Sequence, residues 1–196
     1  ILLGTQMIAK GLDIKNITLV IVINADLGIS IPDFKSHEKI FQLINQVIGR
    51  SGRSNKKGTA IIQTADPTNE VLQMATNYES KKFYNLQLES RKSLNYPPFS
   101  RLMRIIFQSK SEKKCELYSI KIFNLLKNDF KGFIMEPFPC PIEKKFNYVR
   151  YQIIIKIPHQ KLKFAIDKLH SLTKNKLFFN SKNTKILIDM DSDSIL

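Results

Sequence analysis

Two adjacent prolines divide this chain of 196 residues into halves with different patterns of apolar residues. Pro97 and Pro98, within Tyr96-Pro97-Pro98-Phe99, exclude a helix, because proline lacks a backbone N–H and restricts the residue before it to an extended conformation. The length suits one sizeable domain or two small ones. We therefore expect one domain over residues 1–95 and a second over residues 96–196, with the boundary within residues 90–99.

The first half alternates strand and helix signals. The continuous apolar run Leu19–Ile23 is typical of a parallel strand that is buried on both faces. An apolar stripe predicts a helix over residues 38–48, and Ala60–Ile62 predicts a second strand. Asp66 and Pro67 are expected to be the N-cap and first residue of a long helical region that includes Tyr78. This alternation favours an α/β unit with a parallel sheet.

The second half has a different order of elements. Apolar runs predict strands and amphipathic spacing predicts helices, in the order strand 102–107, helix 112–127, strand 133–138, strand 153–157, helix 162–172 and strand 185–190. This β-α-β-β-α-β order is the ferredoxin-like split motif. We expect an α+β domain.

The charge of the chain indicates an anionic partner. Lys and Arg number 31 against 17 Asp and Glu, which gives a net charge of +14 and a pI of about 9.8. Residues 101–196 hold 19 of the cations and 9 of the acids. Such an excess favours nucleic acid first and a membrane surface second. The composition is also rich in Lys, Ile and Asn, and an AT-biased genome could account for part of the excess.

Other features of the composition narrow the class of protein. Cys115 and Cys140 are too few for a disulfide framework or a four-thiolate zinc site, and they suit a reducing cytoplasm. No apolar run approaches the length of a membrane span. The chain opens on Ile1-Leu2-Leu3 without an initiator Met or a signal peptide, so we interpret it as a piece of a longer protein.

The sharpest motif is the segment Gln46–Arg53, which holds two arginines and two glycines. Arg50 and Arg53 are three residues apart and can converge on one point, and guanidinium groups suit the charge that builds on a transferred phosphoryl group. Gly49 and Gly52 are expected to let the backbone turn sharply after the helix. The alternative is a basic helix end that complements the helix dipole.

A second motif covers residues 4–13, before the first strand. The hydroxyl of Thr5, beside Gly4, can reach a phosphate oxygen of a nucleic-acid backbone. Gly11 and Asp13 can pair with an arginine or with a ribose hydroxyl. The alternative is an ordinary connection from a loop through a helix to the strand.

Cations and aromatic rings alternate in the second half. Lys144, Lys145 and Arg150 lie close in sequence to the rings of Phe146, Tyr148 and Tyr151, a mixture that suits phosphate contacts and base stacking. The alternative is a solvated β-hairpin with ordinary aromatic packing.

The helix after Pro158 carries two lysines near its start. Lys161 and Lys163 are unusual there, because the positive end of the helix dipole prefers acidic residues. An acidic ligand could dock at this position, and the alternative is a solvated face of a lysine-rich protein.

These segments together resemble a known family. Gly4–Asp13 resembles motif V and Gln46–Arg53 resembles motif VI of superfamily-2 helicases. The chain is similar in particular to the primosomal replication-restart helicases, through Asn24-Ala25-Asp26, Pro32-Asp33-Phe34 and Tyr96-Pro97-Pro98-Phe99-Ser100-Arg101. The sequence departs from the family at Ile14-Lys15, where Phe-Pro is usual, and at Ser51, where Ala is usual.

The resemblance implies a fold and an activity. Residues 1–95 would be the C-terminal part of a RecA-like helicase lobe, and residues 96–196 a ferredoxin-like, ribosomal-protein-like domain that binds DNA. The whole protein would be an ATP-dependent 3′-to-5′ DNA helicase of the replication-restart primosome, using ATP with Mg²⁺. Its partners would be single- and double-stranded DNA at forks, the acidic tail of single-stranded-DNA-binding protein and other primosome proteins, in the cytoplasm and without a membrane.

The resemblance also implies roles for individual residues. Gln46, Arg50 and Arg53 would face the γ-phosphate of ATP, and Gly11 and Asp13 would couple DNA to the nucleotide. The residues that would contact DNA are Thr5, Gln6, Lys10, Lys144, Lys145 and Arg150.

Some parts of such a helicase have no counterpart in this sequence. It holds neither a phosphate-binding loop of the form G-x-x-x-x-G-K-[ST] nor the cysteine clusters that hold zinc in this family. We therefore expect no metal site here, zinc only upstream, and no ATPase activity from these residues alone. The alternative function is a stand-alone, non-catalytic fragment that binds nucleic acid.

Overall fold

The computed structural model describes residues 1–5, 17–49, 58–174, 184–192 and 194–195. The chain divides into two compact units, Ile1–Leu88 and Glu89–Leu196, and the division falls within helix α5 (Ser80–Ser93). Each unit has its own sheet and its own hydrophobic core.

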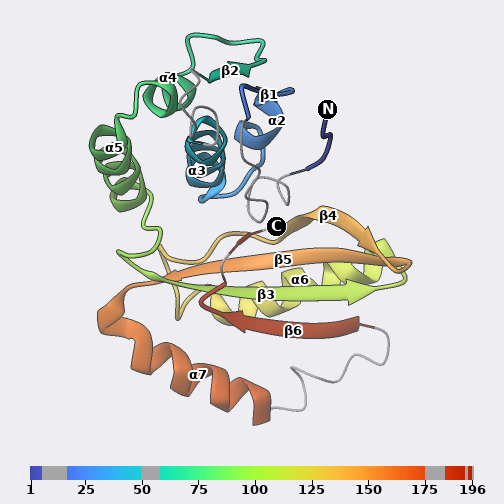
Figure 1. The fold of residues 1–196 in the computed structure, drawn as a ribbon. Coiled ribbons are helices and arrows are strands. Elements are labelled where there is room, and N and C mark those ends of the chain that lie inside the picture. Colours follow the sequence, from blue (N-terminus) through green and yellow to red (C-terminus); the bar gives the residue numbers. More distant parts are fainter. Residues whose placement is uncertain (6–16, 50–57, 175–183, 193, 196) are drawn as a thin grey trace. The chain divides into compact units, whose positions relative to one another are not determined.

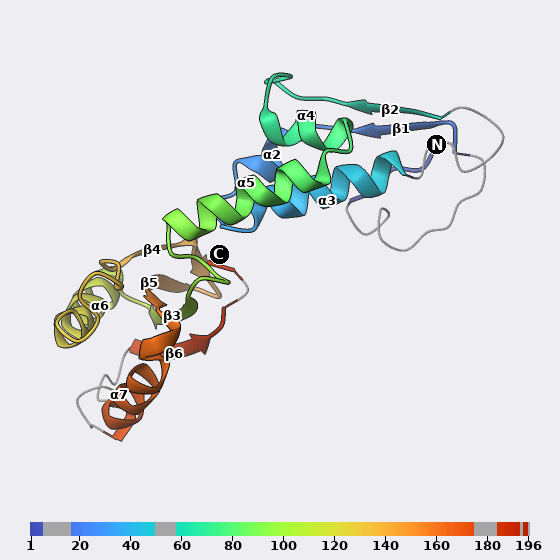
Figure 2. The same ribbon diagram turned by 90° about the vertical axis from the view of Figure 1, so that its left-hand side faces the viewer.

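The first unit is built on a parallel pair of strands. Strands β1 (Leu19–Val22) and β2 (Thr59–Ile62) pair in register, with Val20 opposite Ala60. Helix α3 (Ser36–Ile48) runs alongside both strands (Figure 2). The short helix α2 (Asp26–Ile29) follows β1, and α4 (Glu70–Thr76) follows β2. This is the parallel β-α-β arrangement that the sequence predicts.

The core of the first unit lies between α3, α4 and α5. Ile40, Phe41 and Ile44 are buried on one face of α3, as the period of an amphipathic helix requires. Phe83 of α5 is fully buried, and its ring stacks on that of Phe41 with centroids 3.9 Å apart. The prediction of a core-facing helix that ends at Gly49 is confirmed.

The prediction that the first strand is buried on both faces is wrong. Leu19, Ile21 and Ile61 are about half exposed, whereas the alternate residues Val22 and Ile62 pack against the core. Side chains alternate between the faces of a sheet, and in the described part of this unit helices cover one face only. The apolar face that remains exposed suits a sheet that normally lies inside a larger layer structure.

The helix after β2 begins later than the sequence signals indicate. Asn69, not Asp66, is the N-cap of α4: its side-chain oxygen accepts hydrogen bonds from the N–H groups of Val71 and Leu72. Asp66 instead closes a local turn by accepting from the N–H of Thr68 at 3.0 Å. The long helix also breaks at Tyr78, whose φ is +58°. Several residues in this segment can cap a helix. Asn69 is the cap because the helix that begins after it places its apolar face in the core.

The second unit contains a four-stranded antiparallel sheet. Its strands are β3 (Arg101–Ser109), β4 (Phe138–Lys145), β5 (Tyr148–Ile157) and β6 (Thr184–Met190), in the spatial order β4-β5-β3-β6. Helix α6 (Glu112–Leu126) follows β3 and helix α7 (Leu162–Lys174) follows β5 (Figure 1). The chain order and the strand order together confirm the predicted ferredoxin-like fold.

One strand of this sheet is displaced from its predicted position. Residues 133–138 were expected to form it, but β4 begins at Phe138, and before it only Ile134 makes an isolated bridge, to Ile155. The polar stretch at residues 143–145 joins the ladder because Lys144 and Lys145 pair with Val149 and Tyr148 of β5. Hairpin pairing, rather than apolar content, therefore determines where this strand lies.

The second core lies between the sheet and both helices. It includes Met103, Ile105 and Phe107 of β3 and Ile153 and Ile155 of β5, which alternate along their strands. The helices contribute buried residues of α6 and α7, namely Cys115, Ile122, Leu126, Ala165, Leu169 and Leu172.

The double-proline segment is fastened to the second unit by polar contacts. Lys156 of β5 donates to the carbonyl oxygen of Leu94 at 2.8 Å, and its ammonium group lies 3.7 Å from the centroid of the Tyr96 ring. His159 Nε2 lies 2.7 Å from the carbonyl oxygen of Pro98. Arg91 donates to the carbonyl oxygen of Pro97 at 3.2 Å. Tyr96-Pro97-Pro98 thus belongs structurally to the second unit.

Candidate nucleotide and nucleic-acid sites

The C-terminal end of α3 leads into the arginine motif. Gln46 lies on the exposed side of α3, between the buried residues Ile44 and Val47. Gly49 ends the helix in a helical conformation, with φ −64°, and its N–H donates to the carbonyl oxygen of Asn45 at 2.9 Å. Gly49 therefore does not use the backbone freedom that the sequence analysis assigned to it. Arg50 and Arg53 lie outside the described residues.

The motif at residues 4–13 is described only at its start. Thr5 is exposed and lies outside helices and strands. Gln6, Lys10, Gly11 and Asp13 lie outside the described residues, so the predicted roles of these four positions stay predictions.

A carboxylate that the sequence analysis did not single out as a site residue lies where β1 and β2 end. Thr64 Oγ1 donates to Asp26 Oδ1 at 2.6 Å, and the N–H of Ala65 donates to Asp26 Oδ2 at 2.8 Å. The hydrogen bond from Thr64, followed by that from Ala65, lowers the pKa of Asp26 below its usual 3.8. Asp26 follows β1 and Thr64 follows β2. The carboxyl ends of neighbouring parallel strands meet at one edge of the sheet, so the positions of these two residues after the predicted strands indicate that they lie close together. The edge is where α/β sheets bind ligands.

The basic hairpin separates its cations into two groups. Lys144 and Lys145 are exposed at the end of β4, whereas Arg150 is 8% exposed within β5. Arg150 Nη1 donates to the carbonyl oxygen of Ile142 at 3.4 Å. We therefore correct the expectation for Arg150: it holds the β4–β5 hairpin together from within, and only the two lysines offer their charge at the surface.

The lysines before α7 also differ from each other. Lys161 lies in the 3₁₀ turn η1 (His159–Lys161), before α7 begins, and its ammonium group is 4.8 Å from the centroid of the Phe133 ring. Lys163 is exposed in the first turn of α7. The expectation that both lie in the first turns of one α-helix is thus correct for Lys163 alone.

Both cysteines are buried in the second unit. Burial raises the pKa of the Cys115 thiol and that of the Cys140 thiol, and for Cys140 the charges of Arg150 and Arg104 oppose the rise. Within the described ranges, no three His, Cys, Asp or Glu side chains gather as a metal site would require. Nor do the described helices include one that is long and apolar enough to cross a membrane.

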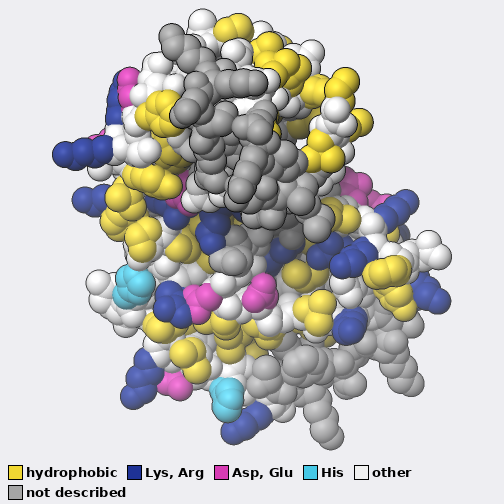
Figure 3. All heavy atoms as spheres, in the orientation of Figure 1, with side chains coloured by type: hydrophobic (Ala, Val, Ile, Leu, Met, Phe, Trp, Pro, Cys, Tyr) yellow, Lys and Arg dark blue, Asp and Glu magenta, His cyan; other side chains and the backbone are white. Residues whose placement is uncertain are grey.

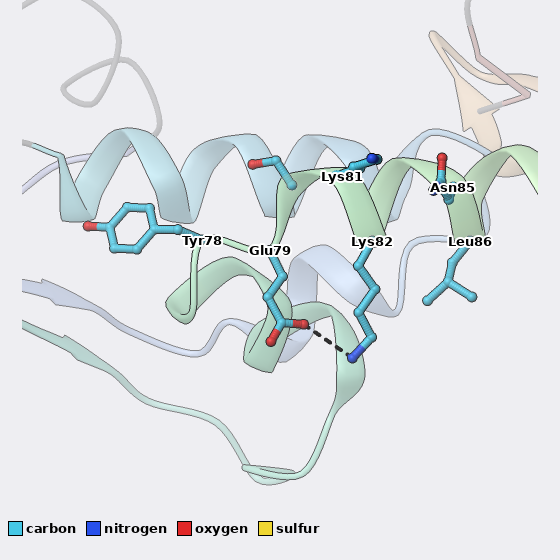
Figure 4. Close-up of a pocket in the computed structure, with 7 residues that line it drawn as sticks. Tyr78, Glu79, Lys81, Lys82, Asn85 and Leu86 are labelled. Carbon is cyan, nitrogen blue, oxygen red and sulfur yellow. Dashed lines mark ion pairs between the residues drawn. The ribbon is translucent and has the colours of Figure 1, made fainter.

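A shallow depression lies where α4 gives way to α5 (Figure 4). It encloses about 540 Å³ and includes an ion pair of 3.2 Å between Lys82 and Glu79. Its lining is one continuous stretch of chain, residues 78–82 with 85 and 86. Ligand sites usually gather groups from several elements, so we assign this depression no role.

Two protein-family models match the chain, one after the other. The family described as "Helicase conserved C-terminal domain" matches residues 1–55. The family described as "Primosomal protein N C-terminal domain" matches residues 92–193, about half of the chain. The chain belongs to the primosomal protein N C-terminal domain family. The first match covers Gln46–Arg53 and the second covers the whole antiparallel sheet, so the predicted fold class, part of a helicase lobe followed by an α+β domain, is confirmed.

Three curated relatives of this chain share a name. The Chlamydia pneumoniae protein called "Replication restart protein PriA" is 38% identical over 198 residues, which cover 97% of this chain and 25% of that protein. The Bacillus subtilis protein of the same name is 38% identical over 194 residues, 97% of this chain and 24% of that protein. The Chlamydia trachomatis protein is 43% identical over 162 residues, 80% of this chain and 21% of that protein. The chain thus spans about a quarter of the length of these relatives.

Proposed function

We propose that this chain is the C-terminal part of an ATP-dependent 3′-to-5′ DNA helicase that acts in replication restart. The observation that carries the proposal is the order of the two family matches: a helicase C-terminal domain precedes a primosomal protein N C-terminal domain in one chain. The relatives that align with 97% of this chain are named replication restart proteins.

Within this proposal the α3 end supplies part of a nucleotide site. Gln46, Arg50 and Arg53 face the γ-phosphate, where the guanidinium groups stabilise the negative charge of phosphoryl transfer. Gly11 and Asp13 couple this site to DNA, and the DNA backbone is held by Thr5, Gln6 and Lys10 with Lys144 and Lys145 of the hairpin.

The chemistry of these residues fits the end of ATP, bound with Mg²⁺, that carries the transferred phosphoryl group. Gln46 is exposed at the end of a helix that the core holds fixed through Ile44 and Val47, so its amide is accessible to a ligand. Bound ATP supplies a phosphoanhydride bond whose hydrolysis drives unwinding. The residues that hold Mg²⁺ and the other phosphates belong to the upstream lobe, and a zinc site belongs there as well.

The exposed face of β1 and β2 favours this proposal over a stand-alone fragment. Leu19, Ile21 and Ile61 present apolar surface that a self-sufficient parallel sheet would cover. The remainder of a helicase lobe would bury it. The second unit, by contrast, has a four-stranded sheet with its own core, so the alternative of a separate nucleic-acid-binding module applies to residues 89–196 alone.

The partners follow from the same proposal. Single- and double-stranded DNA at forks and the other proteins of the primosome are the expected ligands, in the cytoplasm. The acidic tail of single-stranded-DNA-binding protein is a further candidate, for which Lys163 offers an exposed cation.

The decisive experiment joins this chain to a helicase motor. The corresponding quarter of the Bacillus subtilis relative is replaced by this chain, and DNA-stimulated ATP hydrolysis is measured for the fusion and for its Arg50→Ala and Arg53→Ala variants. An arginine finger contributes about 10³–10⁵ to the rate of other nucleotide hydrolases, so each variant should lose at least about 10-fold in turnover while retaining DNA affinity. The isolated chain should release no phosphate.

Lys39→Ala is the matched control, because Lys39 is an exposed cation on α3 away from its C-terminal end. It should leave turnover unchanged. Normal turnover in both arginine variants would show that the motif is structural, and an inactive parent fusion would contradict the proposed helicase function of the chain.

A further inference from the structure

The tip of the β4–β5 hairpin is an exposed aromatic residue. Phe146 and Asn147 connect the two strands, and both have positive φ, +51° and +63°. Two left-handed residues in a two-residue connection correspond to a type I′ turn. The side chain of Phe146 is 85% exposed.

The fold itself gives no reason for a phenylalanine at this position. Type I′ turns favour Asn or Gly, because a bulky side chain is strained in the left-handed region. Phe146 gains no burial in compensation. A residue that costs local stability and gains no burial is expected at a functional position.

The sheet geometry determines which neighbours share a face at this tip. Lys145 lies directly opposite Tyr148 in the ladder, so the two side chains project from the same face. Tyr148 is 38% exposed. The ammonium group of Lys145 lies 5.9 Å from the centroid of the Phe146 ring. Lys145 therefore adjoins two accessible rings, Tyr148 opposite it in the ladder and Phe146 next to it in the turn.

The other members of the sequence motif are separated from this group. Lys144 lies opposite Val149, which packs against the core beneath the helices, so Lys144 belongs to the other face. Arg150 and Tyr151 are both 8% exposed. The structure thus reduces a mixed stretch of cations and rings to three residues on one surface.

The charge around the tip complements a polyanion. Glu143 offsets one of the two lysines locally, but residues 101–196 carry 19 Lys and Arg against 9 Asp and Glu. Figure 3 shows hydrophobic side chains bordered by Lys and Arg at the right-hand end of the sheet, where Figure 1 places the β4–β5 turn.

We infer that Lys145, Phe146 and Tyr148 form a stacking site for single-stranded DNA. A nucleobase stacks on the ring of Phe146, with Tyr148 as a second aromatic surface, and the ammonium group of Lys145 contacts the adjacent phosphate. Every base has a π-face, so such a site is tolerant of sequence. The inference rests on the proposed function, because it presupposes that the chain binds DNA.

The chain contains no tryptophan, so one introduced tryptophan reports on this site alone. Phe146→Trp is titrated with an oligothymidylate and with an abasic strand of the same length, which has the phosphates but no bases. Stacking should quench the emission with the oligothymidylate and leave it unchanged with the abasic strand. Leu125→Trp, at a 44% exposed position of α6, is the control and should respond to neither strand.

Affinity is measured in parallel from the anisotropy of a labelled oligothymidylate. Phe146→Ala should weaken binding about 5- to 150-fold, the range that losing one stacked base corresponds to. Phe146→Asn should weaken it equally while preserving the melting temperature, because Asn suits the turn. This second variant separates loss of the site from loss of the hairpin.

Two results would overturn the inference in different ways. If anisotropy shows binding but the tryptophan at position 146 is not quenched, DNA binds elsewhere on the chain. Full affinity in Phe146→Asn would show the same. In both cases the proposed function would stand. If the parent chain binds no strand at all, DNA binding by this chain is wrong together with the stacking site.

Discussion

The stacked rings of Phe41 and Phe83 in the first core allow a quantitative test of whether the two units unfold independently. Phe83 is fully buried, and its ring lies 3.9 Å from that of Phe41 with planes within 2° of parallel. Phe83→Ala removes this ring from the core between α3, α4 and α5. Because each unit has its own core, the damage should stay within residues 1–88.

The size of the effect follows from the burial. Phe→Ala at a fully buried position costs about 3–5 kcal/mol, which already includes the cavity that remains. The free energy of unfolding of a domain is only about 5–15 kcal/mol. We expect the first unit to lie at the low end of this range, because its sheet has an exposed apolar face. Phe83→Leu, which retains most of the apolar volume, should cost less than about 1.5 kcal/mol.

Hydrogen exchange read by mass spectrometry distinguishes the two units. In Phe83→Ala, peptides from α3 should exchange about 10²–10⁴ times faster, because every 1.4 kcal/mol is a factor of ten. Peptides from β3 should keep their protection. The reciprocal control is Phe107→Ala: Phe107 is equally buried, at the centre of the second core, and its loss should accelerate exchange in β3 and leave α3 unchanged.

Two outcomes would refute this reasoning. Equal acceleration in α3 and β3 for either variant would show that the units unfold as one body. Unchanged exchange of α3 in Phe83→Ala would show that the ring stack contributes little to the first core.

Three further predictions concern charge. The pKa of Asp26 is lowered in the folded state, so the unfolded state binds more protons, and the free energy of unfolding decreases as the pH falls below about 3.8. Urea denaturation of Asp26→Asn should show a smaller decrease over this pH range. An equal decrease in the variant and the parent chain would contradict this. Burial lowers the pKa of Lys156, so stability should rise with pH up to the usual lysine value of 10.5; thermal melts of Lys156→Met should lack the rise, and an identical rise would count against it. Lys144→Ala/Lys145→Ala should reduce the log–log salt dependence of single-strand binding by roughly 1.4, since each phosphate contributes about 0.7; an unchanged slope in salt titrations would exclude both contacts.

The order of the elements in each half and the class of each sheet could be predicted from the sequence. A continuous apolar run followed by an amphipathic helix and a second run can be satisfied by few arrangements other than a parallel β-α-β unit. The apolar runs that form β3 and β5, each followed by an amphipathic helix, likewise predict the ferredoxin-like order of elements. The resemblance of Gln46–Arg53 to motif VI pointed to a helicase segment, and the family match over residues 1–55 agrees.

Local signals were less decisive where several residues compete for one role. Asp66 and Asn69 are both good helix caps, and only packing of Val71 and Leu72 into the core selects Asn69. Residues 133–138 are more apolar than residues 143–145, yet the latter join the sheet because a tight turn places them opposite β5. Strand propensity can be judged from one segment of sequence, whereas strand pairing also depends on the segment that forms the neighbouring strand.

Which charged side chains are accessible could not be predicted from the sequence and became clear from the folded structure. Arg150 and Lys145 lie five residues apart in one basic stretch, and nothing in their spacing shows that one is buried and the other exposed. The difference arises because Arg150 lies inside the sheet, beside the carbonyl oxygen of Ile142, while Lys145 lies at the free end of a hairpin next to Phe146. Exposure is set by what the rest of the chain packs against a residue, and that information is not local in sequence.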